Sequence, residues 1–143
     1  MKISYVTVLV KDQDAALKFY TEKLGWEKKE DDNSVPGMRW LSVAPMGSDC
    51  VRVVLSKPEA HEGDGGGVPG MTKKKAKMLL SRIGQNPTWV LQTEDCKKDY
   101  ENLMSKGVKF TSPPMDMPWG VSCIFEDLYG NPYNLVQPKP MPT

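Results

Sequence analysis

The sequence predicts an α+β fold of two βαβββ repeats, which form a curved mixed sheet around a central cup and carry their helices on the outside. Three observations lead to this prediction. The chain of 143 residues is long enough for one compact domain with a shared core. Each half shows the same order of patterns, namely one strand, one helix and three strands. The two halves also match in register along the sequence.

The match between the halves covers the positions where elements begin and end. It appears when one half is shifted along the other by 82 or 83 residues. The aligned pairs are Tyr5 with Thr88, Asp12 with Asp95, Gly25 with Gly107, and Arg52 with Asn134. These pairs divide the chain into a first repeat at residues 1–58, a linker at 59–87 and a second repeat at 88–143.

The first repeat opens with a strand over residues 3–10, which is rich in β-branched side chains. Tyr5, Thr7 and Leu9 lie on one face, and three valines lie on the other, which we expect to pack on a helix. Asp12 is the expected N-cap of that helix, which has an apolar face and ends at Gly25. Three strands follow, over residues 26–30, 38–44 and 50–55, with a polar turn over 31–37.

The linker breaks this pattern. Five glycines occur among the ten residues that begin at His61, and such a stretch cannot form a core. A short helix follows, which Thr72 caps and Gly84 ends, with its lysines on the solvated side. A loop of this length in a compact domain is usually functional or mobile.

The second repeat begins with a strand over residues 88–93, and Asp95 is the expected N-cap of its helix. Gly107 ends this helix, and a strand over 108–111 follows. The segment 112–118 is rich in proline and predicts a turn. The closing strands are expected over residues 121–125 and 133–137, with a tight turn between them.

Composition excludes several classes of function. The net charge is +1, from 19 basic and 18 acidic residues, so neither a nucleic acid nor a membrane partner is expected. No apolar run is long enough to span a membrane. Three widely spaced cysteines argue against a disulfide framework and favour a cytoplasmic protein. Cys50 and Cys123 are expected to be buried thiols. Cys96 lies at a helix N-terminus, which would lower its pKa somewhat, but a partly buried helix residue is the favoured interpretation.

Several short motifs carry a family resemblance. They are Val8-x-Val10-x-Asp12, Ala16-x-x-Phe19-Tyr20, Leu24-Gly25, Trp119-Gly120 and Phe125-x-Asp127-x-x-Gly130-Asn131. Together they resemble the vicinal-oxygen-chelate superfamily, which includes glyoxalase I, extradiol dioxygenases, methylmalonyl-CoA epimerase, fosfomycin-resistance enzymes and bleomycin-resistance proteins. The resemblance covers most of the chain except residues 59–87.

Enzymes of this superfamily typically hold one divalent metal ion in the cup, with His and Glu ligands from the first and last strand of each repeat. The resemblance places those ligand positions at Tyr5, Arg52, Thr88 and Asn134. None of these side chains suits a catalytic divalent ion, and a guanidinium would repel it. We therefore expect no metal and no other cofactor. The alternative is that His61, the single histidine, reaches the cup as a ligand or base.

The cup is expected to offer aromatic side chains and a few polar groups, which suit a planar or partly charged organic ligand. The candidate ligand-binding residues are Tyr5, Thr7, Trp40, Ser42, Arg52, Thr88, Gln92, Trp119 and Asn134. Arg52 either clamps an anionic group of the ligand or forms an ion pair within the protein. Trp40 and Trp119 either contact the ligand or pack at a sheet edge or dimer contact.

Three hypotheses of function follow. The first is a metal-independent, cytoplasmic protein that sequesters a small molecule, and the resemblance to bleomycin-resistance proteins implies both this role and a homodimer. The second is a metal-dependent lyase, isomerase or dioxygenase with unusual ligands, which the missing ligands argue against. The third is a protein-interaction module that docks a partner through residues 59–87.

Overall fold

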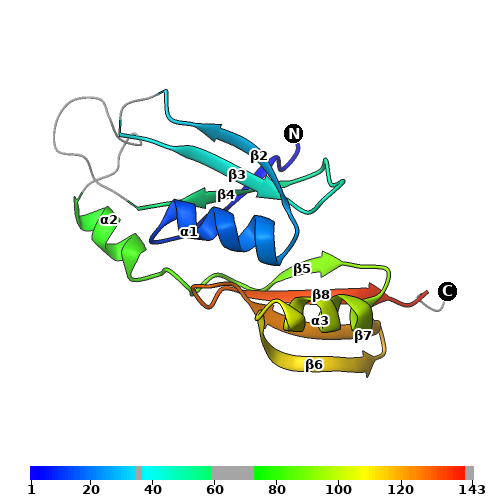
Figure 1. Cartoon of the computed structure of the whole chain (residues 1–143). Coiled ribbons are helices and arrows are strands. Elements are labelled where there is room, and N and C mark those ends of the chain that lie inside the picture. Colours follow the sequence, from blue (N-terminus) through cyan, green and yellow to red (C-terminus); the bar gives the residue numbers. More distant parts are fainter. Residues whose placement is uncertain (35–36, 59–72, 141–143) are drawn as a thin grey trace. The chain divides into compact units, whose positions relative to one another are not determined.

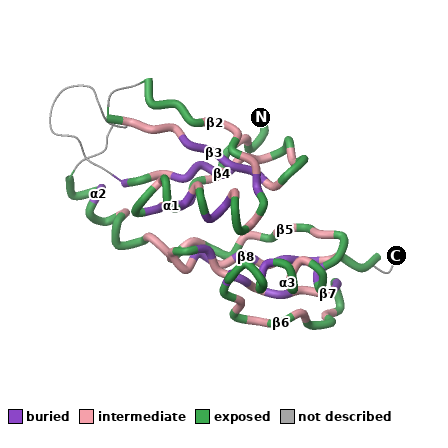
Figure 2. Tube along the Cα trace, viewed as in Figure 1, coloured by how far each residue is buried: buried purple, intermediate pink, exposed green. Residues whose placement is uncertain are grey.

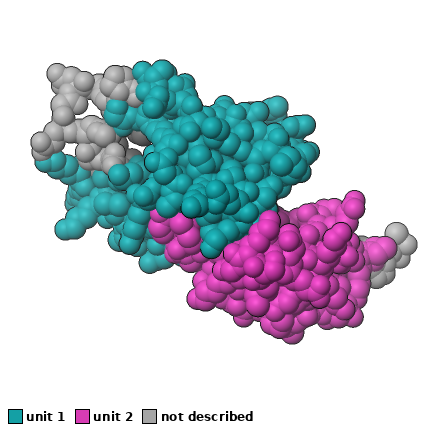
Figure 3. All heavy atoms as spheres, in the orientation of Figure 1, with its two compact units in different colours: residues 1–86 teal, residues 87–143 magenta. Residues whose placement is uncertain are grey.

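The computed structural model describes residues 1–34, 37–58 and 73–140. Contacts divide the chain into two compact units, residues 1–86 and 87–143 (Figure 3). Each unit is described here by itself. His61, Thr72 and most of the predicted Gly-rich linker lie outside the described residues.

Unit 1 is a four-stranded mixed sheet, sheet A, with helices beside it (Figure 1). Its strand order is β1-β4-β3-β2, and β1 pairs with β4 in parallel while the other pairs are antiparallel. Its elements are β1 (Tyr5–Leu9), α1 (Gln13–Lys18), the π-helical turn η1 (Phe19–Lys23), β2 (Glu27–Asp32), β3 (Trp40–Ala44), β4 (Arg52–Ser56) and α2 (Lys73–Leu80).

Unit 2 repeats this topology. Sheet B has the strand order β5-β8-β7-β6, and β5 pairs with β8 in parallel. Its elements are β5 (Trp89–Gln92), α3 (Cys96–Ser105), β6 (Lys109–Met117), β7 (Gly120–Glu126) and β8 (Pro132–Pro138). The predicted α+β class with two βαβββ repeats is therefore confirmed. The central cup depends on how the two units are arranged and stays a prediction.

Local sequence signals account for the ends of the main helices. The Asp12 carboxylate accepts a hydrogen bond from the Ala15 amide at 2.9 Å, and the Asp95 carboxylate accepts one from the Lys98 amide at 3.1 Å. Both predicted N-caps are thus confirmed, because each satisfies a free N–H group of the first helical turn.

The core of unit 1 lies on the face of sheet A that α1 covers (Figures 1 and 2). Val8 and Val10 are fully buried there, as the all-valine face predicts. Ala16 and Tyr20 are fully buried on the helical segment. The remaining fully buried strand residues of this face are Leu41, Val43 and Leu55. Burial of this apolar face is the main force that holds the helix against the sheet.

One predicted turn is wrong. Residues 112–118 do not form a turn, because β6 continues to Met117 through two register shifts, between Phe110 and Ser112 and between Ser112 and Met115. β6 is an edge strand of sheet B, so Pro113 and Pro114 interrupt no ladder on a second side. Tolerance of proline at an edge overrides the turn signal.

Two predictions about cysteines are also wrong. Cys50 is exposed rather than buried. Cys96 and Cys123 are fully buried with their sulfur atoms 3.5 Å apart, and burial raises the pKa of Cys96 instead of lowering it. Desolvation of the thiolate therefore outweighs the effect of the helix N-terminus.

None of the helices in the described part of the chain combines the length and apolarity needed to cross a lipid bilayer.

Candidate functional site

The register of sheet A brings several predicted side chains to the face opposite α1. Tyr5 on β1 pairs directly with Arg52 on β4. On β3, Trp40 and Ser42 alternate with the fully buried Leu41. Glu30 on β2 pairs with Ser42. Since side chains alternate between the two faces of a strand, these positions share one side of the sheet.

Glu30 lies at the centre of this group. Its Oε2 atom accepts hydrogen bonds from Ser42 Oγ at 2.6 Å and from Trp40 Nε1 at 3.0 Å. Its Oε1 atom accepts a hydrogen bond from the Tyr5 hydroxyl at 3.0 Å and lies 3.3 Å from Arg52 Nη1. We call these five residues the Glu30 cluster. Side chains from all four strands of sheet A meet in it.

A β-bulge in β2 places Glu30 in this position. Lys28 pairs with Val43, and the next paired residue is Glu30, which lies opposite Ser42, so Lys29 is the extra residue. Without the bulge, the continuing register would set Lys29 opposite Ser42. The bulge therefore gives the cluster a carboxylate where a regular ladder would give an ammonium group.

The cluster favours the ionised form of Glu30. The hydrogen bond from Ser42 lowers the pKa of Glu30 most, burial opposes it, and the donors Trp40 and Tyr5 and the charge of Arg52 lower it further. The carboxylate is therefore a fixed negative charge at neutral pH.

The Glu30 cluster contains one fully buried residue and two residues that are partly exposed to solvent. Ser42 is fully buried, whereas Tyr5 is 38% exposed and the Arg52 side chain is 40% exposed. The rings of Tyr5 and Trp40 meet edge to face with their centroids 5.2 Å apart. A guanidinium carries five N–H groups, so Arg52 keeps donors beyond its contact with Glu30. The arrangement can offer aromatic surface and hydrogen-bond donors to a ligand.

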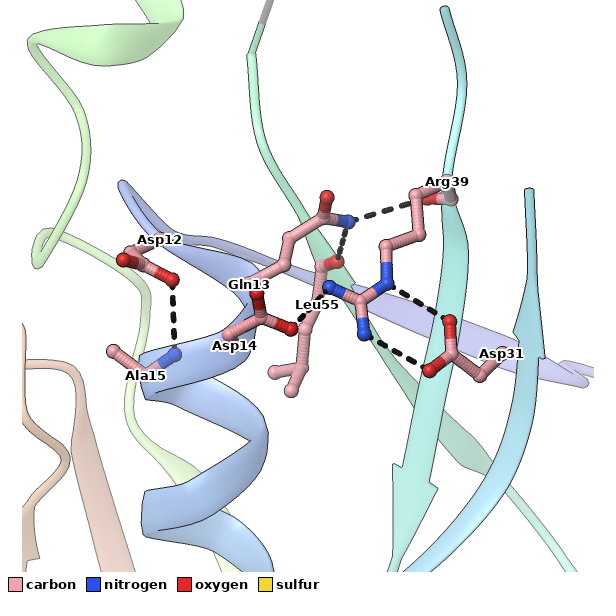
Figure 4. Close-up of polar contacts among 7 residues, drawn as sticks. All are labelled: Asp12, Gln13, Asp14, Ala15, Asp31, Arg39 and Leu55. Carbon is pink, nitrogen blue, oxygen red and sulfur yellow. Dashed lines mark hydrogen bonds and ion pairs between the residues drawn. The ribbon is translucent and has the colours of Figure 1, made fainter. Parts of the chain in front are cut away.

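A second polar network holds β2 from the other face of sheet A (Figure 4). Asp31 follows Glu30 and accepts two hydrogen bonds from the Arg39 guanidinium, at 2.8 and 2.9 Å. Arg39 also lies 2.7 Å from Asp14 on α1. The hydrogen bond with Asp31, and then that with Asp14, raises the pKa of Arg39 above its usual range. The carboxylates of the adjacent residues Glu30 and Asp31 thus form their hydrogen bonds on opposite faces of the sheet.

Gln13 joins the start of α1 to β4 and to the residue that precedes β3. Its side-chain amide donates to the carbonyl oxygen of Leu55 at 2.9 Å and of Arg39 at 3.2 Å (Figure 4). The helix start is therefore linked to β4 and to the chain just before β3 by hydrogen bonds as well as by apolar packing.

Four of the nine predicted site residues meet in the Glu30 cluster, namely Tyr5, Trp40, Ser42 and Arg52. Thr7 is exposed two residues along β1 from Tyr5, on the same face. A ligand-binding role for any of them stays a prediction.

The other four predicted residues belong to unit 2. Thr88 is exposed just before β5, Gln92 is exposed on β5, and Trp119 is 46% exposed between β6 and β7. Asn134 on β8 pairs with Val90 rather than with Thr88. By strand pairing, Val90 is therefore the residue of unit 2 that corresponds to Tyr5.

Asn134 has an unusual environment. Its Oδ1 atom is buried and has no hydrogen-bond partner among the described residues. A buried carbonyl oxygen normally accepts a hydrogen bond, so this position favours an N–H or O–H donor.

The residues at the expected metal positions do not fit a divalent ion. They are a phenol, a guanidinium, a hydroxyl and an amide, at Tyr5, Arg52, Thr88 and Asn134. The nearby carboxylate of Glu30 already faces four donors, and one of them is a cation. No group of three or more His, Cys, Asp or Glu side chains within the described ranges could hold a metal ion.

Sequence reasoning missed Glu30. The residues of β2 are Glu27, Lys28, Lys29, Glu30, Asp31 and Asp32, and all are charged. Apolar alternation therefore gives no sign of which face each side chain takes. The available signal was Arg52, because a partly buried guanidinium needs a negative partner.

Comparisons with known proteins agree with this architecture. Residues 2–135 match the model of the Glyoxalase/Bleomycin resistance protein/Dioxygenase superfamily. The uncharacterized protein YurT of Bacillus subtilis is 36% identical over 140 residues, which cover 96% of this chain and 99% of YurT.

Two solved structures are similar over nearly their whole length. UcmS2 is 33% identical with a TM-score of 0.79, and the match covers 95% of this chain and 97% of UcmS2. TnmS3, an antibiotic binding protein from Streptomyces sp. CB03234, is 30% identical with a TM-score of 0.74, and the match covers 97% of each chain. The chain belongs to the Glyoxalase/Bleomycin resistance protein/Dioxygenase superfamily.

Proposed function

We propose that this protein binds a small organic ligand at the Glu30 cluster without a metal ion, and that it sequesters the ligand rather than transforming it. One observation carries the proposal: four residues predicted to bind a ligand meet around a single carboxylate, and Tyr5 and Arg52 remain partly exposed there. Aromatic surface with a few oriented polar groups is typical of small-molecule sites.

An antibiotic is the ligand class that we favour. TnmS3 is an antibiotic binding protein and is similar to this chain over 97% of its length. The residues at the expected metal positions support binding without metal catalysis, because none of them is a good ligand for a divalent ion. We also propose a cytoplasmic homodimer, which the superfamily resemblance supports and which light scattering after size-exclusion chromatography would test.

The first test is the metal content of untagged protein purified without chelator, followed by a thermal-shift screen of antibiotics. We expect less than about 0.1 metal ion per chain and at least one ligand that raises Tm, since a ligand that binds only the native state stabilises it by mass action. Stoichiometric metal would contradict the metal-independent function.

Two variants locate the site once a ligand is found. Trp40→Ala and Arg52→Ala should each weaken binding by about tenfold or more, because each removes a ligand contact worth at least about 1.4 kcal/mol. Met46→Ala, which truncates a side chain 69% exposed on a turn, should leave the affinity unchanged. An equal loss of ligand affinity in all three variants would contradict binding at the Glu30 cluster.

A further inference from the structure

We infer that Glu30 determines ligand specificity at this face, and that it selects a planar aromatic ligand without negative charge. The inference rests on the proposed function and deepens it, because it assigns a charge class to the ligand. It also assigns Arg52 to an internal ion pair with Glu30 rather than to the clamping of an anionic group.

Arg52 is poorly suited to clamp an anion. Its Nη1 atom lies 3.3 Å from Glu30 Oε1, so its charge is balanced within the cluster. An anionic group that approached Arg52 would also approach the Glu30 carboxylate, and like charges at such distances repel. A neutral acceptor such as a carbonyl oxygen can use the remaining N–H groups of Arg52 without this repulsion.

The rest of this face reinforces the same preference. Glu27 pairs with Ala44 and Asp32 pairs with Trp40, so both carboxylates lie on the face of Glu30. Glu27 is balanced by Lys29 at 3.1 Å. Among the described strand positions on this face, the three carboxylates outnumber the two basic groups, those of Arg52 and Lys29, which lie beside Glu30 and Glu27. The face therefore opposes anions and tolerates neutral or cationic ligands.

Glu30 acts on the ligand through its charge and its neighbours. Its two oxygen atoms already face four donors, so it offers little capacity for another hydrogen bond. It also orients the indole of Trp40 and the phenol of Tyr5, whose edge-to-face packing presents aromatic surface to a planar ring. Loss of the Glu30 charge should therefore change the selectivity between ligands of different charge more than the affinity for a neutral ligand.

The test compares three ligands with one ring framework and different charge. Acridone is neutral with a carbonyl oxygen, 9-aminoacridine is a cation, and acridine-9-carboxylate is an anion at neutral pH. Fluorescence titration of the full chain should give dissociation constants for acridone and 9-aminoacridine at least about tenfold below that for the carboxylate, after allowing for partial solvent screening.

Two matched variants connect this discrimination to Glu30. In Glu30→Gln, the dissociation constant for acridine-9-carboxylate should exceed those for acridone and 9-aminoacridine by less than about threefold, mainly because the carboxylate binds more tightly. Asp14→Asn removes an exposed carboxylate on α1, which covers the other face of sheet A, and should leave the ratio of dissociation constants near the wild-type value. Circular dichroism checks that both variants fold. If Glu30→Gln does not fold, the salt dependence of the wild type provides the test. The ratio of its dissociation constants for the anionic and the other acridines must fall as salt increases, because salt screens electrostatic repulsion.

The outcomes separate the inference from the proposed function. Equal affinities for the three ligands, or the same discrimination in Glu30→Gln, would overturn the role of Glu30. The proposed function would survive that result if Trp40→Ala still weakened binding. Failure of all three acridines to bind would count against both.

Discussion

Glu30 and Arg52 lie on strands β2 and β4, which are separated by β3, yet their side chains form an ion pair of 3.3 Å across sheet A. The pair spans β3 directly above the buried hydroxyl of Ser42, which donates to the same carboxylate. A charge pair over a satisfied buried hydroxyl fixes three strands relative to one another. This arrangement leads to the first prediction.

Glu30→Gln should lower the free energy of unfolding at neutral pH by about 1–2 kcal/mol, because it weakens bonds to a charged acceptor that is partly exposed. The folded state lowers the pKa of Glu30, so the ionised carboxylate stabilises the fold above the ordinary glutamate pKa of about 4.3. This stabilisation is lost as the pH falls below that value.

Urea denaturation between pH 7 and pH 3.5 measures this contribution. The wild type should lose more stability across that range than Glu30→Gln, which lacks the titrating group. Glu94→Gln, at an exposed position outside the Glu30 cluster, is the control and should follow the wild type. Parallel curves for the wild type and Glu30→Gln would contradict the prediction.

The Arg39 network yields a prediction about two carboxylates that contact one guanidinium. The Asp31 side chain is 24% exposed and binds Arg39 through two hydrogen bonds, whereas Asp14 is 84% exposed and binds it once. Asp31→Asn should therefore cost about 1–2 kcal/mol in the free energy of unfolding, and Asp14→Asn less than about 0.5 kcal/mol. Urea denaturation at pH 7 gives both values, and an equal cost would refute this ranking.

Gly120 is expected to tolerate no side chain. A Cβ atom at this position would lie 2.2 Å from the carbonyl oxygen of Gln137, and its φ of 148° is rare for other residues. Gly120→Ala should lower the free energy of unfolding by about 3 kcal/mol or more. Gly47→Ala also changes a residue with positive φ, but nothing lies within 4 Å of its Cβ position. Gly47→Ala should lower the free energy of unfolding by only about 1 kcal/mol. Thermal denaturation measures both variants, and similar decreases in Tm would disprove the steric argument.

The cysteines should differ in reactivity. Cys50 is exposed, whereas Cys96 and Cys123 are fully buried, and burial raises the pKa of Cys123 to about 12. The thiolate is the reactive form, so a thiol reagent at pH 8 should modify Cys50 rapidly and leave the buried pair untouched. Mass spectrometry after brief labelling measures this. Cys50→Ser should abolish the rapid reaction, and fast modification of Cys96 in that variant would argue against the buried pair.

Much of the fold could be predicted from the sequence because its signals are local. The caps Asp12 and Asp95 each bond to an amide three residues away, so a short window of sequence contains both partners. Alternation along β1 and β3 likewise identified Tyr5, Trp40 and Ser42, because apolar residues between them are fixed in the core.

The parts that could not be predicted depend on contacts between distant segments. The extra residue in β2 is defined only by its pairing with β3, and a strand of six charged residues gives no apolar alternation. Pro113 and Pro114 are compatible with β6 only because it lies at the edge of sheet B, and strand order is a property of the assembled sheet. The burial of Cys96, at the start of α3, likewise involves a distant segment, because its sulfur atom lies 3.5 Å from that of Cys123 on β7.

The bulge at Lys29 also makes this position tolerant of a change in chain length. On either side of it, Lys28 pairs with Val43 and Glu30 pairs with Ser42, which are themselves neighbours on β3. A chain one residue shorter at position 29 would form a regular ladder and keep the partner of every other β2 residue. Deletion of Glu27 or Lys28 would also be absorbed, because Lys29 could then pair with Val43 while Glu30 stays opposite Ser42, whereas deletion of Asp31 would move Asp32 to the other face. The bulge therefore allows the loss of one residue on the N-terminal side of Glu30 without loss of the Glu30 cluster.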